Sequence, residues 1–165
     1  MSEVLADADA MYFLDKPEHP GIAALTAYWE SKRNGNAMPD RRDIVPSEIV
    51  KLLPNLHICE VLEDGRDFRF RLFGTALVTV LGAEMTGKRV SEIGGGSIVS
   101  KPDAARRRWL DVTSRAYEGR HPVFASGHLV NTIRRNVRWH SFAAPLTAGG
   151  AATEQILGAI FFIEE

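Results

Sequence analysis

Two segments near the end of the chain are apolar on both faces of the strand that each would form. Val137 to Phe142 carries large side chains at odd and even positions alike, and Ile156 to Ile163 is apolar throughout. A sheet with one face in water alternates apolar and polar residues, so this sheet must be covered on both faces. We expect the long helix that precedes these strands to cover one face. The N-terminal helix or a second subunit is expected to cover the other.

Helical periodicity marks the segments that could provide this cover. Apolar residues at helical spacing predict a helix over 21–33, and a shorter helix is expected over 46–53. The strongest helix signal lies between Ser100, which can cap the first turn, and Gly119, which can end the last. Its predicted buried stripe is Ala105, Trp109, Val112 and Ala116, and we expect both Trp109 and Trp139 in the core.

Strand signals fill most of the remaining chain. Residues 56–62 are apolar and β-branched, Asp64-Gly65 has the composition of a hairpin turn, and residues 68–73 alternate strictly. A short helix fits 75–81, and extended runs follow at about 122–132, 136–146 and 155–163. Because the strands come in hairpin-linked groups, the sequence predicts an α+β fold with a five-stranded antiparallel sheet.

The length of 165 residues fits one domain. We expect a flexible lead-in over 1–20, N-terminal helices over 21–54 and a core domain over 55–165. No apolar run reaches the roughly 18 residues of a membrane span, and the acidic N-terminus is unlike a secretory signal. The single cysteine, Cys59, cannot form an internal disulfide, which favours a cytoplasmic location.

Acidic and basic residues are unevenly distributed along the sequence, although the net charge is −1. Residues 101–140 contain nine basic and three acidic side chains. Such an excess can mark a nucleic-acid surface, but the Arg106 to Arg108 run would fan around a helix rather than form one face. A solvated helix and hairpin is therefore the favoured interpretation, and a nucleic-acid partner is not expected.

Several short stretches resemble a known family. They are Tyr28-Trp29, Arg42-Asp43-Ile44, Leu52-Leu53-Pro54, and Phe68 to Thr75 followed by Gly82, Glu84, Thr86 and Gly87. Over about residues 21–163 the chain resembles a family of short bacterial stand-alone PAS-domain-like proteins. The resemblance implies a PAS-like five-stranded sheet with flanking helices, here with an N-terminal helical extension. It also implies a non-enzymatic sensor or protein-interaction module in signal transduction, whose output would act in trans.

Five residues are candidates for lining a ligand pocket. Thr75 follows Gly74 where the second strand gives way to short helices, which the resemblance makes the rim of a cavity. Tyr117, His128 and His140 could add polar groups, and a hairpin centred on Arg134-Arg135 would place His128 opposite residue 141. Arg71 could hold an anionic ligand if it faced the pocket. If it faced the other way, it would need acidic structural partners.

No cofactor can be assigned. The resemblance implies that haem or covalent flavin would use a histidine or cysteine on a helix beside the pocket, and residues 74–119 contain neither. Noncovalent flavin or another ligand stays open. The five histidines include no pair at metal-ligand spacing and are expected to be satisfied or half-exposed. The run from Gly82 to Lys88 has phosphate-loop spacing, but Arg89 follows where a Ser or Thr is needed, so a glycine-bounded turn is favoured.

Two further hypotheses concern catalysis and assembly. A small α+β isomerase or hydrolase with His128 or His140 as base in the sheet cavity is the alternative function, although no paired nucleophile and base can be named. The stripe of Ile22, Leu25 and Trp29 predicts a homodimer through the N-terminal helix, with Trp29 as the anchor. The competing hypothesis is that this helix packs only on its own sheet.

Overall fold

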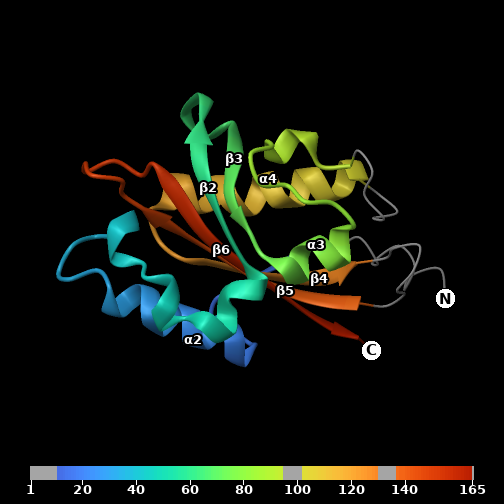
Figure 1. The fold of residues 1–165 in the computed structure, drawn as a ribbon, viewed down its shortest axis with the longest axis horizontal. Helices are drawn as coiled ribbons and strands as arrows, with labels where there is room; N and C mark the ends of the chain where they lie inside the picture. The colour runs from blue at the N-terminus through green and yellow to red at the C-terminus, as the bar shows by residue number, and fades with distance from the viewer. Residues whose placement is uncertain (1–10, 95–101, 130–136, 165) are drawn as a thin grey trace.

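Six antiparallel strands form one sheet in the computed structural model, which describes residues 11–94, 102–129 and 137–164. The strand order is β1-β4-β5-β6-β2-β3, with β5 and β6 at the centre (Figure 1). All five neighbouring pairs are antiparallel. The bounds are β1 Met11–Leu14, β2 Leu56–Leu62, β3 Asp67–Phe73, β4 Val123–Leu129, β5 Val137–Leu146 and β6 Gln155–Glu164.

Three α-helices and five 3-10 turns connect these strands in the described chain. The α-helices are α2 Pro20–Ser31, α3 Thr75–Leu81 and α4 Pro102–Gly119. Among the described residues, none of the helices has the length and apolar character that crossing a membrane requires. The 3-10 turns are η2 Arg41–Asp43, η3 Pro46–Glu48, η4 Val50–Asn55, η5 Glu63–Gly65 and η6 Val90–Glu92.

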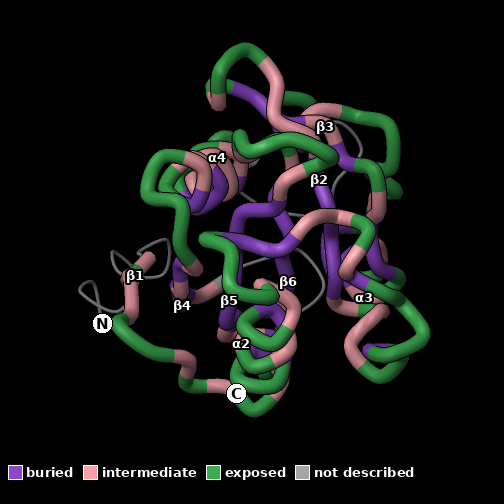
Figure 2. The backbone as a smooth tube through the Cα atoms, turned by 90° about the vertical axis from the view of Figure 1, so that its left-hand side faces the viewer, coloured by how far each residue is buried: buried purple, intermediate pink, exposed green. Residues whose placement is uncertain are grey.

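The sheet is covered on both faces, as its apolar strands predict. Figure 1 shows α4 and α2 on opposite sides of the sheet, and in Figure 2 the strands are the most continuously buried part of the chain. One apolar cluster joins the sheet to α3, η6 and α4, and a second joins it to α2 and the 3-10 turns that follow. The long helix and the N-terminal helix therefore supply the two covers within a single chain.

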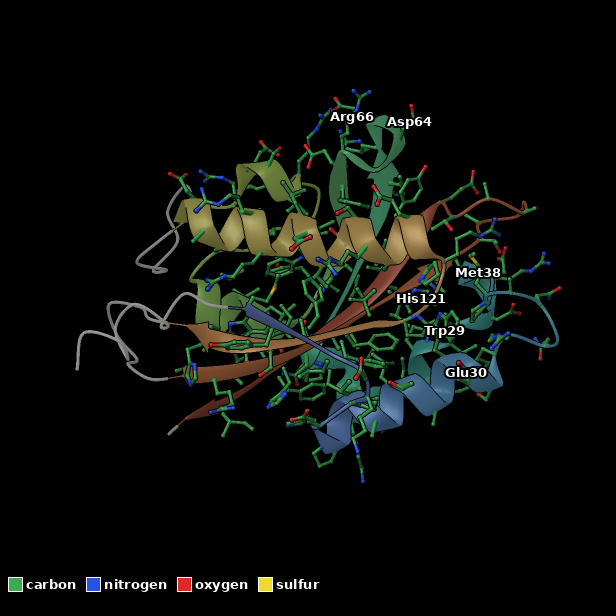
Figure 3. The ribbon with its side chains drawn as sticks, turned by 180° about the vertical axis from the view of Figure 1, so that it is seen from behind. Trp29, Glu30, Met38, Asp64, Arg66 and His121 are labelled. Atoms are coloured by element: carbon green, nitrogen blue, oxygen red, sulfur yellow. The ribbon has the colours of Figure 1, made fainter. Side chains whose placement is uncertain are left out.

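The apolar stripe on α2 packs against the chain's own sheet. Ile22, Leu25 and Trp29 are each at most 1% exposed. The indole Nε1 of Trp29 donates a 3.0 Å hydrogen bond to the carbonyl of Pro145 in β5, and Figure 3 shows this side chain between α2 and the sheet. These three side chains are therefore not available to a second copy in this arrangement, and self-association stays a prediction.

Three details of the predicted fold need correction. The sheet has six strands rather than five, because the short apolar run Met11–Leu14 inside the predicted lead-in pairs with β4. The helix expected over 46–53 is two 3-10 turns, separated at Ile49, where ψ is 36°. The alternation of β3 is broken by a bulge, which turns Leu72 toward the α2 layer and Phe73 toward the α4 layer. Ser100 and the predicted turn at Arg134-Arg135 lie outside the described residues.

Asp40 ties the N-terminal layer to the far end of the central hairpin. Its carboxylate accepts hydrogen bonds from Thr147 Oγ1 (2.8 Å) and from the amide of Gly149 (2.7 Å). It also caps η2 by accepting a bond from the amide of Arg42 (3.1 Å). These bonds, led by the one from Gly149, hold the pKa of Asp40 below its usual value. The Asp40 side chain thus reinforces the backbone bridge between Asp40 and Thr147 that joins the N-terminal layer to the loop between β5 and β6.

Replacement of Asp40 is expected to destabilise the fold in a pH-dependent way. Asp40→Ala should lower the free energy of unfolding by about 1–2 kcal/mol at pH 7, the usual cost of losing an N-cap with its partners. Because folding lowers the pKa, this contribution is present above the ordinary carboxyl pKa and is lost as the pH falls through the folded-state pKa. Urea unfolding between pH 7 and pH 3 measures both effects.

Asp40→Asn removes the charge and one of the two accepting oxygens, of which Oδ1 accepts from Arg42 and Oδ2 from Thr147 and Gly149, and an intermediate loss is expected. Asp111→Ala is the matched control, since Asp111 makes only an exposed ion pair with Arg115 on α4. It should change stability by less than about 0.5 kcal/mol. Equal losses for Asp40→Ala and Asp111→Ala would show that Asp40 does not tether the layer.

Candidate functional site

A cavity of about 70 Å³ lies between the sheet and helices α3 and α4. Its walls are mostly apolar and are formed by residues of the sheet, of α3 and of α4. The polar residues that line it are His57, Arg108, Thr113 and Ser141. The apolar residues are Leu77, Val80 and Leu81 of α3, Ala105, Trp109 and Val112 of α4, and Trp139, Phe142, Ala143, Ile160 and Phe162 of β5 and β6.

His57 enters this space because of a glycine on the neighbouring strand. It lies on β2 and pairs with Gly158 of β6. A Cβ at position 158 would lie 2.1 Å from Cε1 of His57, so the imidazole occupies the place of a missing side chain. Phe70 packs edge-on to the ring, and Trp109 lies 5.0 Å from it between centroids. The ring is thereby fixed among aromatic neighbours.

The electrostatics of His57 follow from this burial. The residue is 3% exposed, and its Nδ1 has no hydrogen-bond partner among the described residues. Burial lowers the pKa of His57 from 6.5 to about 3, so the imidazole is neutral at pH 7. A neutral imidazole has one nitrogen that accepts and one that donates. A lining residue of the cavity thus buries an uncharged polar atom whose hydrogen-bonding capacity is unused among the described residues.

Ser141 adds a second unused polar atom. It lies on β5, is 7% exposed, and its Oγ has no partner in the described chain. Thr113, which also lines the cavity, instead donates its hydroxyl to the carbonyl of Trp109 on the same helix (2.8 Å). Arg108 is engaged within the chain as well. Of the four polar side chains described around the cavity, His57 and Ser141 are the two with a buried polar atom that has no partner in the described chain.

None of the five pocket candidates chosen from the sequence lines this cavity. Thr75 is exposed in the first turn of α3. Tyr117 lies one turn beyond the cavity on α4, where a Cβ on Gly65 would be 2.3 Å from its ring. Trp109, expected in the core, is only partly buried and forms part of the cavity wall, whereas Trp139 is buried as expected.

The two histidine candidates lie on the face that α2 covers. The register pairs Ser126 with His140 and His128 with Arg138. The two histidines therefore share one face, diagonally placed, and are not on opposite faces as the predicted hairpin centre implied. His140 lies 5.8 Å from His19 between ring centroids, and its burial lowers its pKa. A histidine base in the cavity would have to be His57, since the side chain of His140 is on the opposite face from Ser141.

If Arg71 faced away from the pocket, it was expected to need an acidic structural partner, and the structure provides one in Glu60. Arg71 lies at the β3 bulge, and its Nη1 is 3.8 Å from Oε1 of Glu60. The same oxygen lies 3.3 Å from Nη1 of Arg69. The Arg71 side chain is 61% exposed and is not among the residues that line the cavity.

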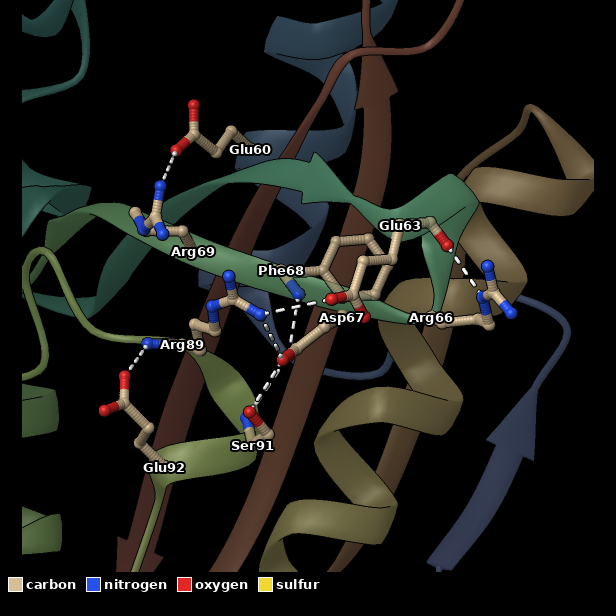
Figure 4. Close-up of polar contacts among 9 residues, drawn as sticks. All are labelled: Glu60, Glu63, Arg66, Asp67, Phe68, Arg69, Arg89, Ser91 and Glu92. Atoms are coloured by element: carbon tan, nitrogen blue, oxygen red, sulfur yellow. Dashed lines mark hydrogen bonds and ion pairs between the residues drawn. The ribbon is translucent and has the colours of Figure 1, made fainter.

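The glycine-bounded turn over 82–88 protects the outer edge of β3. Gly87 donates its amide to the carbonyl of Phe70, and Phe70 donates its amide to the carbonyl of Lys88. Beyond it, Asp67 accepts bonds from Ser91 Oγ (2.6 Å) and from the amide of Phe68 (2.9 Å). Figure 4 shows this network, in which Arg89 also approaches Glu63 and Asp67. These bonds give the segment a structural role as the expected glycine-bounded turn, with positive φ at Gly82 and Gly87.

The described residues contain no group of three or more His, Cys, Asp or Glu side chains that could hold a metal ion. Cys59 is fully buried on β2, burial raises the pKa of its thiol, and it is not part of the cavity wall. The wall as described thus offers hydrogen bonds and apolar contacts rather than metal or thiol chemistry.

Comparison with known proteins adds a family and a fold. A family model described as "PAS domain" matches residues 17–161. The structure is similar to that of the PAS domain from Bordetella pertussis BvgS, with a TM-score of 0.54 and 19% identity over 72% of this chain and 85% of that one. It is also similar to a sensory box sensor histidine kinase from Vibrio cholerae, with a TM-score of 0.48 and 14% identity over 72% and 90% of the two chains. Comparison with curated proteins gives no match.

The buried neutral His57 should make the fold sensitive to mild acid. Because its folded-state pKa lies below the unfolded value of 6.5, the unfolded state binds the extra proton and stability falls as the pH drops below 6.5. For one such histidine the loss at pH 5 relative to neutral pH is about 2 kcal/mol. Urea unfolding at pH 7.5 and pH 5 should show this loss in the wild type and a smaller one in His57→Phe.

His140→Phe is the matched control on the opposite face. His140→Phe should reduce the pH dependence of the unfolding free energy less than His57→Phe does. The reason is that His57 is fully buried, and its pKa is lowered more than that of His140. The assignment is wrong if His57→Phe keeps the wild-type slope between pH 7.5 and pH 5.

Proposed function

Since the chain belongs to the PAS domain family, we propose that it is a sensory module whose ligand occupies the cavity between the sheet and helices α3 and α4. A PAS fold supports a sensory or protein-interaction role, and PAS domains are generally not enzymes. The proposal is therefore of a non-enzymatic, cytoplasmic module that senses a small molecule and signals through contact with another protein.

The observation that carries the proposal is an apolar cavity whose lining includes two side chains with unused polar atoms. His57 and Ser141 both line the cavity and are at least nine-tenths buried, and Nδ1 and Oγ have no partner among the described residues. Such atoms cost about 1–3 kcal/mol each when left unsatisfied, and folded proteins contain few of them. A cavity that combines apolar walls with a few convergent polar groups is typical of a ligand site.

Helix α4 supplies a route from the cavity to the surface. Trp109 and Val112 line the cavity, and Tyr117 lies further along the same helix. The Tyr117 ring packs on Gly65, at the exposed turn between β2 and β3, where φ is 86°. A shift of α4 on ligand binding would therefore move this turn, because no side chain lies between the ring and the backbone of Gly65. We propose that the altered turn is the surface that a protein partner reads.

A cavity-filling variant tests the proposal. Ala105 lines the cavity from α4, while its neighbour Ala104 does not. We expect a fragment library containing acids, amines and uncharged compounds to yield ligands that shift the methyl NMR signals of Val80 and Val112 in the wild type. Ala105→Leu should abolish these shifts by occupying the space, and Ala104→Leu should keep them. Ligand binding should also shift the Gly65 amide signal.

Each variant is first checked by thermal unfolding, since added methylenes in a packed site can strain it. A library in which no compound gives saturable shifts at the cavity methyls would contradict ligand sensing. Cavity shifts without any change at Gly65 would contradict the proposed route of transmission.

A further inference from the structure

We propose that the contact between the start of α2 and the sheet, formed by His19, Gly21, Phe161 and His140, is a pH switch that opens when His19 is protonated. The switch lies on the face of the sheet opposite the cavity, so it does not depend on a ligand. It goes beyond the proposed sensory function and can succeed or fail separately from it.

The cap of α2 requires an unprotonated imidazole. His19 is the N-cap residue, and its Nδ1 accepts a 3.0 Å hydrogen bond from the amide of Gly21. A protonated imidazole donates from both nitrogens and cannot accept, so protonation removes this bond. It also places a positive charge at the positive end of the helix dipole. The first turn of α2 has no acidic residue to offset that charge.

The same imidazole joins the helix start to the sheet. It stacks on Phe161 of β6, with 4.5 Å between the ring centroids. Phe161 also lies against Gly21, where a Cβ would be 2.4 Å from Cζ of the ring. The cap residue and the backbone of Gly21 therefore contact the same aromatic ring. From Ile22 onward the buried stripe of α2 is apolar and does not titrate, so the change is confined to the start of the helix.

A second imidazole lies beside the first. His140 of β5 is 5.8 Å from His19 between ring centroids, and its Nδ1 is buried without a partner in the described chain. Two protonated rings this close repel each other. Burial lowers the pKa of both histidines, and the neighbouring His19 lowers that of His140 further. His19 is half-buried and can take up a proton from solvent, whereas His140 is buried.

These contacts make the closed state less stable in mild acid. In the open state, with the first turn of α2 unwound, the two histidines have the ordinary pKa of about 6.5. In the closed state their pKa values are lower, so the open state binds more protons. The closed state is therefore favoured above pH 6.5 and loses stability as the pH falls below it. Because residues 15–19 connect this turn directly to β1, opening also loosens the tether of that edge strand.

The other charged and titratable groups nearby do not reverse this direction. After burial and His19, Arg138 of β5 lowers the pKa of His140, while Glu18 raises it. Beside His140 and Arg138, β6 presents the apolar side chains Phe161 and Ile163. The remaining groups in the segment before α2 or on this face of β1 and β4 are Asp15, Lys16, Tyr12 and His128.

Amide hydrogen exchange of the full-length protein tests the switch. The amide of Ala23 donates to the carbonyl of His19 and reports closure of the first turn of α2. Its protection factor, which corrects for the intrinsic pH dependence of exchange, is measured at pH 7.5 and pH 5. We expect a fall of about fivefold in the wild type, the effect of losing one N-cap.

Three variants assign this fall to His19. Asparagine caps a helix through an oxygen that does not titrate, so His19→Asn should give the same protection of Ala23 at both pH values. His19→Ala has no cap at either pH and should show low protection throughout. His57→Phe, on the cavity side of the sheet, should keep the wild-type fall.

A titration of the histidine ring protons by NMR tests the pairing of the two imidazoles. His19→Asn should raise the pKa of His140, because His19 is, after burial, the largest influence that lowers it. An unchanged His140 pKa in this variant would contradict the pairing.

The switch is overturned if wild-type Ala23 is equally protected at both pH values, or if His19→Asn keeps the fall. A fall that His57→Phe abolishes would assign the acid sensitivity to the other face and would also overturn it. These measurements do not involve a ligand, whereas the sensory function fails only when no compound binds in the cavity. The two failures are therefore distinguishable.

Discussion

The whole arrangement depends on a central sheet that is apolar on both faces. Along β5, Ser141 and Ala143 face the cavity and α4, while Phe142 and Ala144 are buried against the α2 layer. Burial of both faces requires two helical covers, which α4 and α2 supply. The cover on the α2 side is pinned by hydrogen bonds from Trp29 and to Asp40. The cover on the α4 side borders the cavity, so the candidate site lies on this face of the sheet.

Most of the fold could be predicted because its signals are local. The alternation and the apolar runs place five of the six strands, and the helical periodicities place α2, α3 and α4 close to their observed bounds. What sequence reasoning missed depends on pairing rather than on local preference. The strand Met11–Leu14 is a strand only because β4 offers it an edge, and the bulge that redirects Leu72 follows from its register with β2. A four-residue apolar run or a broken alternation gives no local signal of either event.

The site was harder to predict than the fold, because only the sheet brings its residues to the same cavity. His57 and Ser141 are far apart in the sequence and belong to no motif, whereas the candidates Thr75, Tyr117 and His140 were chosen for local reasons. Two weak signals were present: a histidine inside an apolar strand, and Gly158 inside another. A glycine within a strand often marks the close approach of another group. Only the register of β2 with β6 shows that the approaching group is the His57 ring.

The two unpartnered polar atoms, Nδ1 of His57 and Oγ of Ser141, lower the stability of the fold. Two unsatisfied buried groups at about 1–3 kcal/mol each are a large share of a typical net stability of about 5–15 kcal/mol. Replacing His57 by an apolar ring of similar shape, or Ser141 by Ala, would remove the cost without disturbing the backbone. A ligand that satisfies the same atoms recovers that energy only when it is bound, and at a hundredfold excess over its dissociation constant it adds about 2.7 kcal/mol to stability. Because α4 forms one wall of the cavity, the proposed sensory function would draw on this energy to shift the position of that helix.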